Sequence, residues 1–548
     1  MQSLRRIAPS IITIFLLLSS TSHLQAQSAE STGNVYLIAM LVIIGALILV
    51  SAILLLSENF VQLEASKAGV DSKGQQSSFS SSVKSLWQSS GPAYTGDDPV
   101  TYLSKGHDIL LNGSANQTAT LGSAKRYAVK PTDYRGMSPI PKVVVAEGEE
   151  VQAGDVIFFD KKDPTVKYVS PVSGEVVEIR RGAKRAITGV IILADSDVKF
   201  RQMDPPSINE ASREDIQTFL YESGGWAMIN ERPFDQVPAP GTVPTNIFIS
   251  TFDSAPLAPD LNYIVSGKEE LFQKGIDTLA RLTDGDIHLG LDARGEGAPS
   301  DVFAKAENCQ KHWFSGKHPS GNVGVQIHHT APINAGDKVW TLNVQQVITL
   351  GELMYKGIYN AERLVAITGA QVSNPGYAKT YVGASINELL DGNLSEKKSR
   401  IIDGDVLSGK AIGDDTFLSQ ASDQISVIEE GDYYEMFGWL LPFKPRPTIS
   451  KTFPNFLFPK LKFDGDTNTH GEKRAFVVSG QYEKVLPMKV FPQHLMKAIM
   501  CGEFEQMEGL GIYELSEEDV ALCEFVCTSK MPLQSILRDG LDMIKEQS

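Results

Sequence analysis

The chain has 548 residues, enough for about three globular domains at roughly 100–200 residues each. Its apolar fraction of 42% and charged fraction of 21% are typical of a protein with ordinary hydrophobic cores. The net charge of −16 argues against a nucleic-acid partner, because phosphate binding requires concentrated Lys and Arg. Four cysteines are too few for a disulfide scaffold and favour a reducing compartment.

The N-terminus contains two apolar segments. Residues 1–26 have the pattern of a secretory signal, with Arg5 and Arg6 before an apolar run and a possible cleavage site after Ala26. Residues 35–57 are apolar and uncharged. Their length matches the roughly 20 residues that a helix needs to cross a bilayer. They predict a transmembrane helix, with a buried core helix as the alternative. Whether or not the signal is cleaved, the number of crossings places the rest of the chain in the cytoplasm.

A Ser-rich linker and a β-rich domain follow. Residues 58–98 contain few apolar side chains and predict a flexible linker with a reach of roughly 35 Å. In residues 99–200, short β-type runs alternate with glycine turns, as in "EGEEVQAGDVIFF" and "SPVSGEVVEI". This pattern predicts a small β-barrel and resembles the barrel-sandwich hybrid fold of lipoyl and biotinyl carrier domains.

Residues 201–340 alternate helical and strand-like stretches, which predicts a parallel α/β domain. The order of elements resembles the flavin-binding domain of the NADH-binding subunit of respiratory complex I and of the C subunit of the Rnf ferredoxin oxidoreductase. Their glycine-dense loop lets backbone N–H groups approach the flavin phosphate. Here Gly224-Gly225-Trp226 keeps two glycines beside a bulky ring. We therefore expect a retained scaffold without flavin chemistry.

Three histidines in the same domain are the candidate contact residues, His318, His328 and His329. An imidazole can hydrogen-bond a quinone carbonyl or a partner protein, and the alternative is an ordinary structural role. A zinc site would need three or four converging ligands, and Cys309 is the only nearby thiol. We predict no catalytic, cofactor-binding or metal residue.

Residues 341–480 contain a strand, the turn Asn374-Pro375-Gly376, a second strand and a short helix. This order resembles the soluble-ligand-binding β-grasp (SLBB) module, which lies beside the flavin domain in complex I. Residues 481–548 predict a C-terminal helical domain. There Cys523 and Cys527 match the last two thiols of the ferredoxin-type motif of the Rnf protein. A cubane cluster needs four thiolates, so we expect none.

The predicted fold class is therefore an α/β multidomain (α+β) protein with one N-terminal transmembrane helix. The run from about Tyr102 to Ser548 resembles the family of A subunits of the sodium-translocating NADH:quinone reductase. Its most specific segments include "GEVVEIRRGAKR", "FDSAPLAPD", "KVWTLNVQQVITLGEL", "DQISVIEEGDYYEMFGW" and "EEDVALCEFVC". The N-terminal membrane segment is extra to the family.

The resemblance implies a non-redox subunit on the cytoplasmic face of the bacterial inner membrane. It belongs to a complex of six subunits, A–F, and packs chiefly on the membrane-embedded B subunit. NADH, FAD, FMN, iron centres and quinone would be used by the other subunits, and quinone reduction would be coupled to sodium export. One alternative is an Rnf-type electron-transfer subunit, which requires flavin or cluster ligands. Another is a membrane-tethered binding protein built from lipoyl-like and SLBB modules.

Overall fold

The computed structural model describes residues 91–547 without 296, 414–415, 436–445 and 451–453, and also residues 40–42 and 44–45. The chain divides into two units, Met1–Ser90 and Gly91–Ser548. Residues 40–42 and 44–45 are helical. The predicted signal, the rest of the membrane segment and the linker up to residue 90 lie outside the described residues. Within the described ranges, no helix is both long and apolar enough to cross a bilayer.

The barrel-sandwich hybrid consists of two small antiparallel sheets, ordered β3-β9-β8-β5 and β4-β6-β7. Strand β8 begins with alternating buried and exposed residues from Gly174 to Val177, whereas β9 is buried continuously from Gly189 to Ile192. The strands are β3 (Arg126–Val129), β4 (Lys142–Val143), β5 (Glu150–Val151), β6 (Val156–Phe159), β7 (Lys167–Val169), β8 (Gly174–Arg181) and β9 (Ile187–Ala194). Short 3₁₀ turns accompany them at η2 (Ala93–Thr95), η3 (Pro131–Asp133) and η4 (Ala183–Arg185).

The α/β domain is built on a six-stranded sheet with the order β1-β13-β12-β11-β14-β10. All neighbours are parallel except the edge pair β10 and β14. The strands are β1 (Val100–Leu103), β10 (Asn230–Arg232), β11 (Asn246–Ser250), β12 (Ile287–Asp292), β13 (Gln310–Gly316) and β14 (Val339–Thr341).

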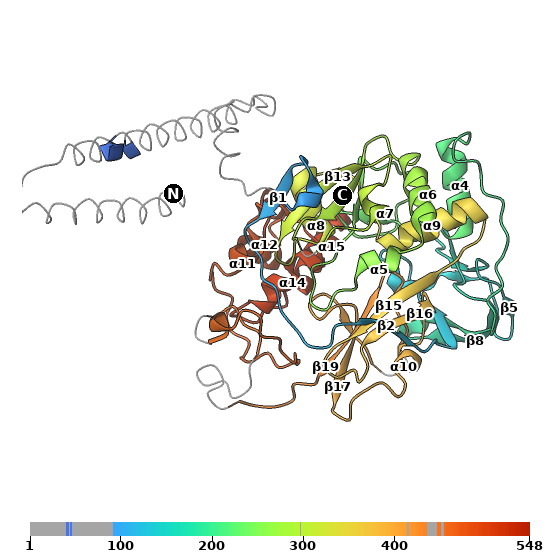
Figure 1. The fold of residues 1–548 in the computed structure, drawn as a ribbon. Helices are drawn as coiled ribbons and strands as arrows, with labels where there is room; N and C mark the ends of the chain where they lie inside the picture. Colours follow the sequence, from blue (N-terminus) through green and yellow to red (C-terminus); the bar gives the residue numbers. More distant parts are fainter. Residues whose placement is uncertain are drawn as a thin grey trace, which may run out of the picture. The chain divides into compact units, whose positions relative to one another are not determined.

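Helices cover this sheet (Figure 1). They are α4 (Arg213–Ser223), η5 (Trp226–Met228), α5 (Leu261–Val265), α6 (Glu269–Ala280), α7 (Asp301–Ala304), α8 (Val323–Thr330) and α9 (Val344–Lys356). Capping boxes start α4 at Ser212 and α9 at Asn343, where side chains satisfy the first backbone N–H groups. Helix α9 is buried from Val344 to Met354, so it is a core helix.

The fourth sheet has the order β18-β17-β19-β15-β16-β2 and mixes parallel and antiparallel pairs. Its elements are β2 (Asn116–Leu121), β15 (Glu362–Thr368), β16 (Gly376–Tyr381), α10 (Ile386–Leu389), β17 (Ser399–Asp403), β18 (Lys410–Ala411) and β19 (Gln424–Glu429). Strand β15, the turn, β16 and α10 follow the predicted order. Strands β1 and β2 precede the barrel in sequence but pair in the other two sheets, which ties the modules together.

The C-terminal region is helical and lies beside β1 and β13 (red in Figure 1). Its elements are η6 (Pro454–Leu457), α11 (Tyr482–Val485), α12 (Pro492–Cys501), α13 (Phe504–Gly509), η7 (Ile512–Glu514), α14 (Glu517–Phe525) and α15 (Leu533–Gln547). Its core includes Leu103 of β1 and Phe314 of β13. A second, larger core runs through the barrel, the α/β domain and the SLBB sheet. The modules therefore share cores rather than acting as independent domains.

Candidate functional site

A cavity of about 590 Å³ opens where β11 and β14 end. From β11 the chain runs outward to β12 and β13, and then returns to add β14 on the other side of β11. This reversal is a topological switch point, where ligands of open α/β sheets bind beyond the carboxyl ends of the strands. Asp253 follows β11 and Asn343 follows β14, and both line the cavity. The SLBB sheet, the loop at Asp133 and the start of α14 complete its walls.

One wall is held by an ion-pair network between the α/β domain and α14. Arg232 is 4% exposed, and its guanidinium lies 2.7 Å from Glu518 Oε1, 3.3 Å from Asp519 Oδ2 and 3.4 Å from Asp235 Oδ1. Arg135 lies 2.6 Å from Glu517. A buried arginine requires such partners, because an unpaired buried charge costs several kcal/mol. Both arginines of this wall are therefore paired within the chain, although the buried Arg232 Nε and Asp519 Oδ1 have no hydrogen-bond partner.

The opposite wall carries three carboxylates that form no ion pair within the described part of the chain, Asp253, Asp403 and Asp405. Asp403 Oδ2 accepts hydrogen bonds from the backbone and hydroxyl of Ser419, whereas its buried Oδ1 has no hydrogen-bond partner. Burial raises the pKa of Asp253 to about 6, and Asp405 adds to this shift. The sequence analysis did not identify this carboxylate group.

The two glycines that resemble part of a flavin-binding loop have packing roles. Gly224 ends α4 with a φ of 80°. A Cβ at Gly225 would lie 2.7 Å from a methyl group of Leu220 and 2.8 Å from one of Leu353, so glycine allows these two leucines to pack closely against the turn. Trp226 is fully buried, donates a 2.7 Å hydrogen bond to the Pro238 carbonyl, and packs edge-on against Trp340.

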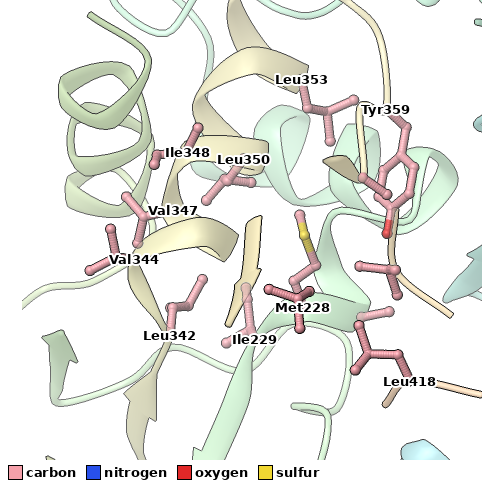
Figure 2. Close-up of a cluster of buried hydrophobic side chains, with 14 of the residues drawn as sticks. Met228, Ile229, Leu342, Val344, Val347, Ile348, Leu350, Leu353, Tyr359 and Leu418 are labelled. Carbon is pink, nitrogen blue, oxygen red and sulfur yellow. The ribbon is translucent and has the colours of Figure 1, made fainter. Parts of the chain in front are cut away.

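The side chains after Trp226 continue the same core. Met228 and Ile229 point into an apolar cluster with Leu350 and Leu353 of α9 (Figure 2). Leu418 of the SLBB region belongs to this cluster, which joins it to the α/β domain. The backbone that approaches flavin phosphate in the resembled proteins is thus covered here by large apolar side chains.

The thiols of the degenerate ferredoxin-like motif are also core residues. Cys523 lies in α14 and Cys527 follows it, and both are buried in the C-terminal core. Burial raises the pKa of Cys523 far above its ordinary value. The Tyr482 hydroxyl lies 2.8 Å from Cys527 Sγ. Cys501 is exposed at the end of α12. Within the described ranges, no three His, Cys, Asp or Glu side chains converge to hold a metal ion.

The three candidate histidines lie in two places. His318 follows β13 and is 4% exposed; its Nδ1 lies 3.1 Å from Ser254 Oγ, and its buried Nε2 has no partner. Burial lowers the pKa of His318 to about 4, so the ring is neutral at pH 7. His328 and His329 lie on α8 and face the C-terminal region.

The two α8 histidines bond to that region directly. His328 Nδ1 lies 2.5 Å from Glu514, and its Nε2 accepts from the backbone N–H of Lys489. His329 Nε2 donates to the Pro487 carbonyl. These contacts support a structural role for both residues, and contact with quinone or a partner protein stays a prediction.

The chain is similar to proteins of one family along most of its length. Residues 101–195 match the family model described as the NqrA N-terminal barrel-sandwich hybrid domain, residues 211–359 the NqrA second alpha/beta domain, and residues 364–413 the NQRA C-terminal domain. Similar proteins named as the A subunit of Na(+)-translocating NADH-quinone reductase come from Shewanella frigidimarina, Alcanivorax borkumensis and Vibrio atlanticus. They are 38%, 37% and 36% identical, each covering 81% of this chain and 99% of the relative.

Among solved structures, the chain resembles an NAD⁺-reducing [NiFe]-hydrogenase in its air-oxidised and H₂-reduced states. The identity is 11%, with 64% of this chain and 67% of that chain covered, at TM-scores of 0.30 and 0.31. No functional argument rests on similarity at this level.

Proposed function

Because this chain belongs to the family of A subunits of Na⁺-translocating NADH-quinone reductases, we propose that it is the peripheral A subunit of such a complex and carries no redox group itself. Electrons from NADH would pass through flavins and iron centres of other subunits to quinone, with export of Na⁺. The similarity to relatives along almost their whole length supports the assignment to the complex.

The proposal that the chain carries no redox group rests on one observation. The residues at the positions where the resembled proteins bind cofactors are packed in the core of this chain. Gly225 lies against α4 and α9, Trp226 fills the core behind it, and Cys523 and Cys527 are buried among apolar side chains. A flavin phosphate needs accessible backbone N–H groups, and a cubane cluster needs four thiolates. The residues present do not fit either group.

Residues 35–57 would anchor the protein, with the body in the cytoplasm and in contact chiefly with the membrane-embedded B subunit. The uncharged apolar sequence supports an anchor, and the Ser-rich residues 58–98 would tether the body to it. A fluorescent reporter fused after Ser548 should be bright, and a periplasmic phosphatase reporter at the same place should be inactive. The opposite pair of results would contradict the orientation.

His318 is the histidine most suited to a quinone contact, because its neutral ring has an unused Nε2. In the assembled complex, His318→Ala should raise the apparent KM for quinone and leave the KM for NADH unchanged. His494→Ala, on an exposed side chain outside the candidate residues, is the matched control for quinone kinetics. Unchanged quinone kinetics in a fully assembled His318→Ala complex would remove this contact from the proposal.

Membership of the complex is tested by affinity purification of the tagged full chain from solubilised membranes. We expect it to elute with flavin-containing membrane subunits and with Na⁺-stimulated NADH:quinone reductase activity. Elution alone, without other subunits or activity, would favour the membrane-tethered binding protein. Elution of the chain alone with its own stoichiometric flavin would favour the Rnf-type alternative.

A further inference from the structure

The cavity at the switch point is strongly acidic. Eight carboxyl side chains line it against three basic ones, Arg135, Arg232 and Lys410. The two arginines form ion pairs with Asp235, Glu517 and Glu518 in the wall described above. Lys410 is exposed and forms no ion pair with another described residue. The remaining carboxylates therefore leave an excess of negative charge around the cavity.

These remaining carboxylates differ in how far the chain itself neutralises them. Asp133 Oδ1 lies 3.3 Å from Lys130, and Asp423 accepts a 2.8 Å hydrogen bond from Gln345 with Arg363 at 4.0 Å. Asp253, Asp403 and Asp405 form no ion pair with another described residue, although Arg294 acts on Asp253 at longer range and Lys410 stands opposite Asp403 across β17 and β18. Their hydrogen bonds come from neutral backbone N–H and hydroxyl groups. A positively charged group is the missing partner.

Asp403 provides independent evidence for a ligand. It is 7% exposed and lines the cavity, and its Oδ1 is a buried acceptor without a hydrogen bond. An unpaired buried carboxylate oxygen costs free energy unless a cation, a donor or water meets it. Ser419 holds the other oxygen, so the carboxylate is fixed rather than free to rotate away.

We propose that this cavity binds a linear polyammonium ligand of the spermidine class, with separate amines at Asp403 and at the Asp253–Asp405 pair. A single metal ion does not fit, since no three acidic or metal-ligating side chains converge among the described residues. An alkylammonium group has donors and no acceptor, which suits isolated carboxylates. Its methylene chain would lie along the apolar lining, which includes Phe252, Leu261 and Leu342.

The size and dipoles of the site are compatible with such a ligand. A cavity of about 590 Å³ lies in the range of small-molecule sites, about 300–1,000 Å³. The N-termini of α8, α9 and α14 also face the cavity, each with a partial positive charge of about half a unit. Capping boxes at Asn343 and Ser516 satisfy the N-termini of α9 and α14. These partial positive charges are too small to neutralise the three carboxylates that form no ion pair.

The test is equilibrium dialysis of labelled spermidine with the full chain in detergent at low ionic strength. Wild type should bind it saturably at one site. Asp403→Asn keeps the acceptor for Ser419 but removes the charge, and should weaken binding about tenfold or more. Glu210→Gln removes an exposed carboxylate outside the cavity and should bind like wild type. Thermal melts of both variants check that they fold.

Three results would overturn the proposal. One is the absence of saturable spermidine binding by the folded wild-type chain. Another is equal binding by wild type and folded Asp403→Asn. The third is displacement of labelled spermidine by NaCl or by a lysine-rich peptide at a lower concentration than unlabelled spermidine requires. Displacement by NaCl would assign the site to Na⁺, and displacement by the peptide would assign it to a basic protein segment. Because dialysis requires neither quinone nor the other subunits, its failure leaves the assignment to the complex unaffected.

Discussion

The Gly224–Met228 turn and the switch-point cavity lie close together in the α/β domain and differ in how well their polar groups are satisfied. In the turn, the indole N–H of Trp226 has its acceptor and the glycines fit closely against neighbouring helices. In the cavity, Asp403 keeps a buried acceptor without a donor. The comparison teaches that a surviving motif fragment is a weak sign of a site, whereas an unsatisfied buried group is a direct one.

The substitution Trp226→Ala tests the first half of this comparison and should have the largest effect on stability. If the ring is core rather than a plug in a usable flavin site, its loss should destabilise the chain by about 3–5 kcal/mol. Chemical denaturation followed by circular dichroism measures the change. Trp226→Phe keeps most of the volume and should cost clearly less. A stable Trp226→Ala chain that acquires flavin would show that the ring blocks a working site.

The cysteines give a smaller effect of the same kind. Cys523→Ser places a hydroxyl in an apolar core and should cost about 1–3 kcal/mol. Cys501→Ser, on an exposed thiol, should stay within about 0.5 kcal/mol of wild type. Electron transfer from NADH to quinone per assembled complex should be unchanged in both variants. Loss of iron or of electron transfer in assembled Cys523→Ser complex would contradict the structural role.

The cavity gives an effect of opposite sign. The folded-state pKa of Asp253, about 6, lies above its ordinary value of 3.8, so ionising this group costs folded wild type stability as pH rises through that window. Asp253→Asn removes the cost. It should be more stable than wild type by about 3 kcal/mol at pH 8, and the difference should almost vanish near pH 3.

Denaturant titrations at both pH values measure this difference, and saturating spermidine should reduce it at pH 8, because the ligand would neutralise the wild-type carboxylate. Equal stability of the two chains at pH 8 would show that the Asp253 carboxylate is not under electrostatic strain. A stability difference that is independent of pH would mean that the substitution acts through packing rather than charge.

Local patterns predicted much of the fold. The glycine turns indicated the barrel, and the Asn374-Pro375-Gly376 turn with its flanking strands indicated the SLBB sheet, because these features act over a few residues. The positions of β1 and β2 were not predicted. Their partners β13 and β16 lie more than two hundred residues away, and no short-range pattern encodes such pairing.

The arrangement of the candidate site could not be predicted either, because it also depends on contacts between residues far apart in the sequence. The histidines stand close together in sequence, yet His318 bonds Ser254 whereas His328 bonds Glu514 on the C-terminal region. The cavity carboxylates come from segments as distant as Asp133 and Asp423, without a shared motif. Asp253, Asp403 and Asp405 share the lack of an ion pair with another described residue, and this property emerges only when segments from separate modules meet.

The central claim is that the protein keeps the scaffold of a redox protein without its cofactors, and an absorption spectrum of the anaerobically purified full chain tests it most directly. We predict a spectrum of aromatic side chains alone, with no flavin bands and no broad iron–sulfur absorption, from protein that still assembles with the membrane subunits. A stoichiometric flavin or iron–sulfur chromophore in the isolated chain would contradict the account.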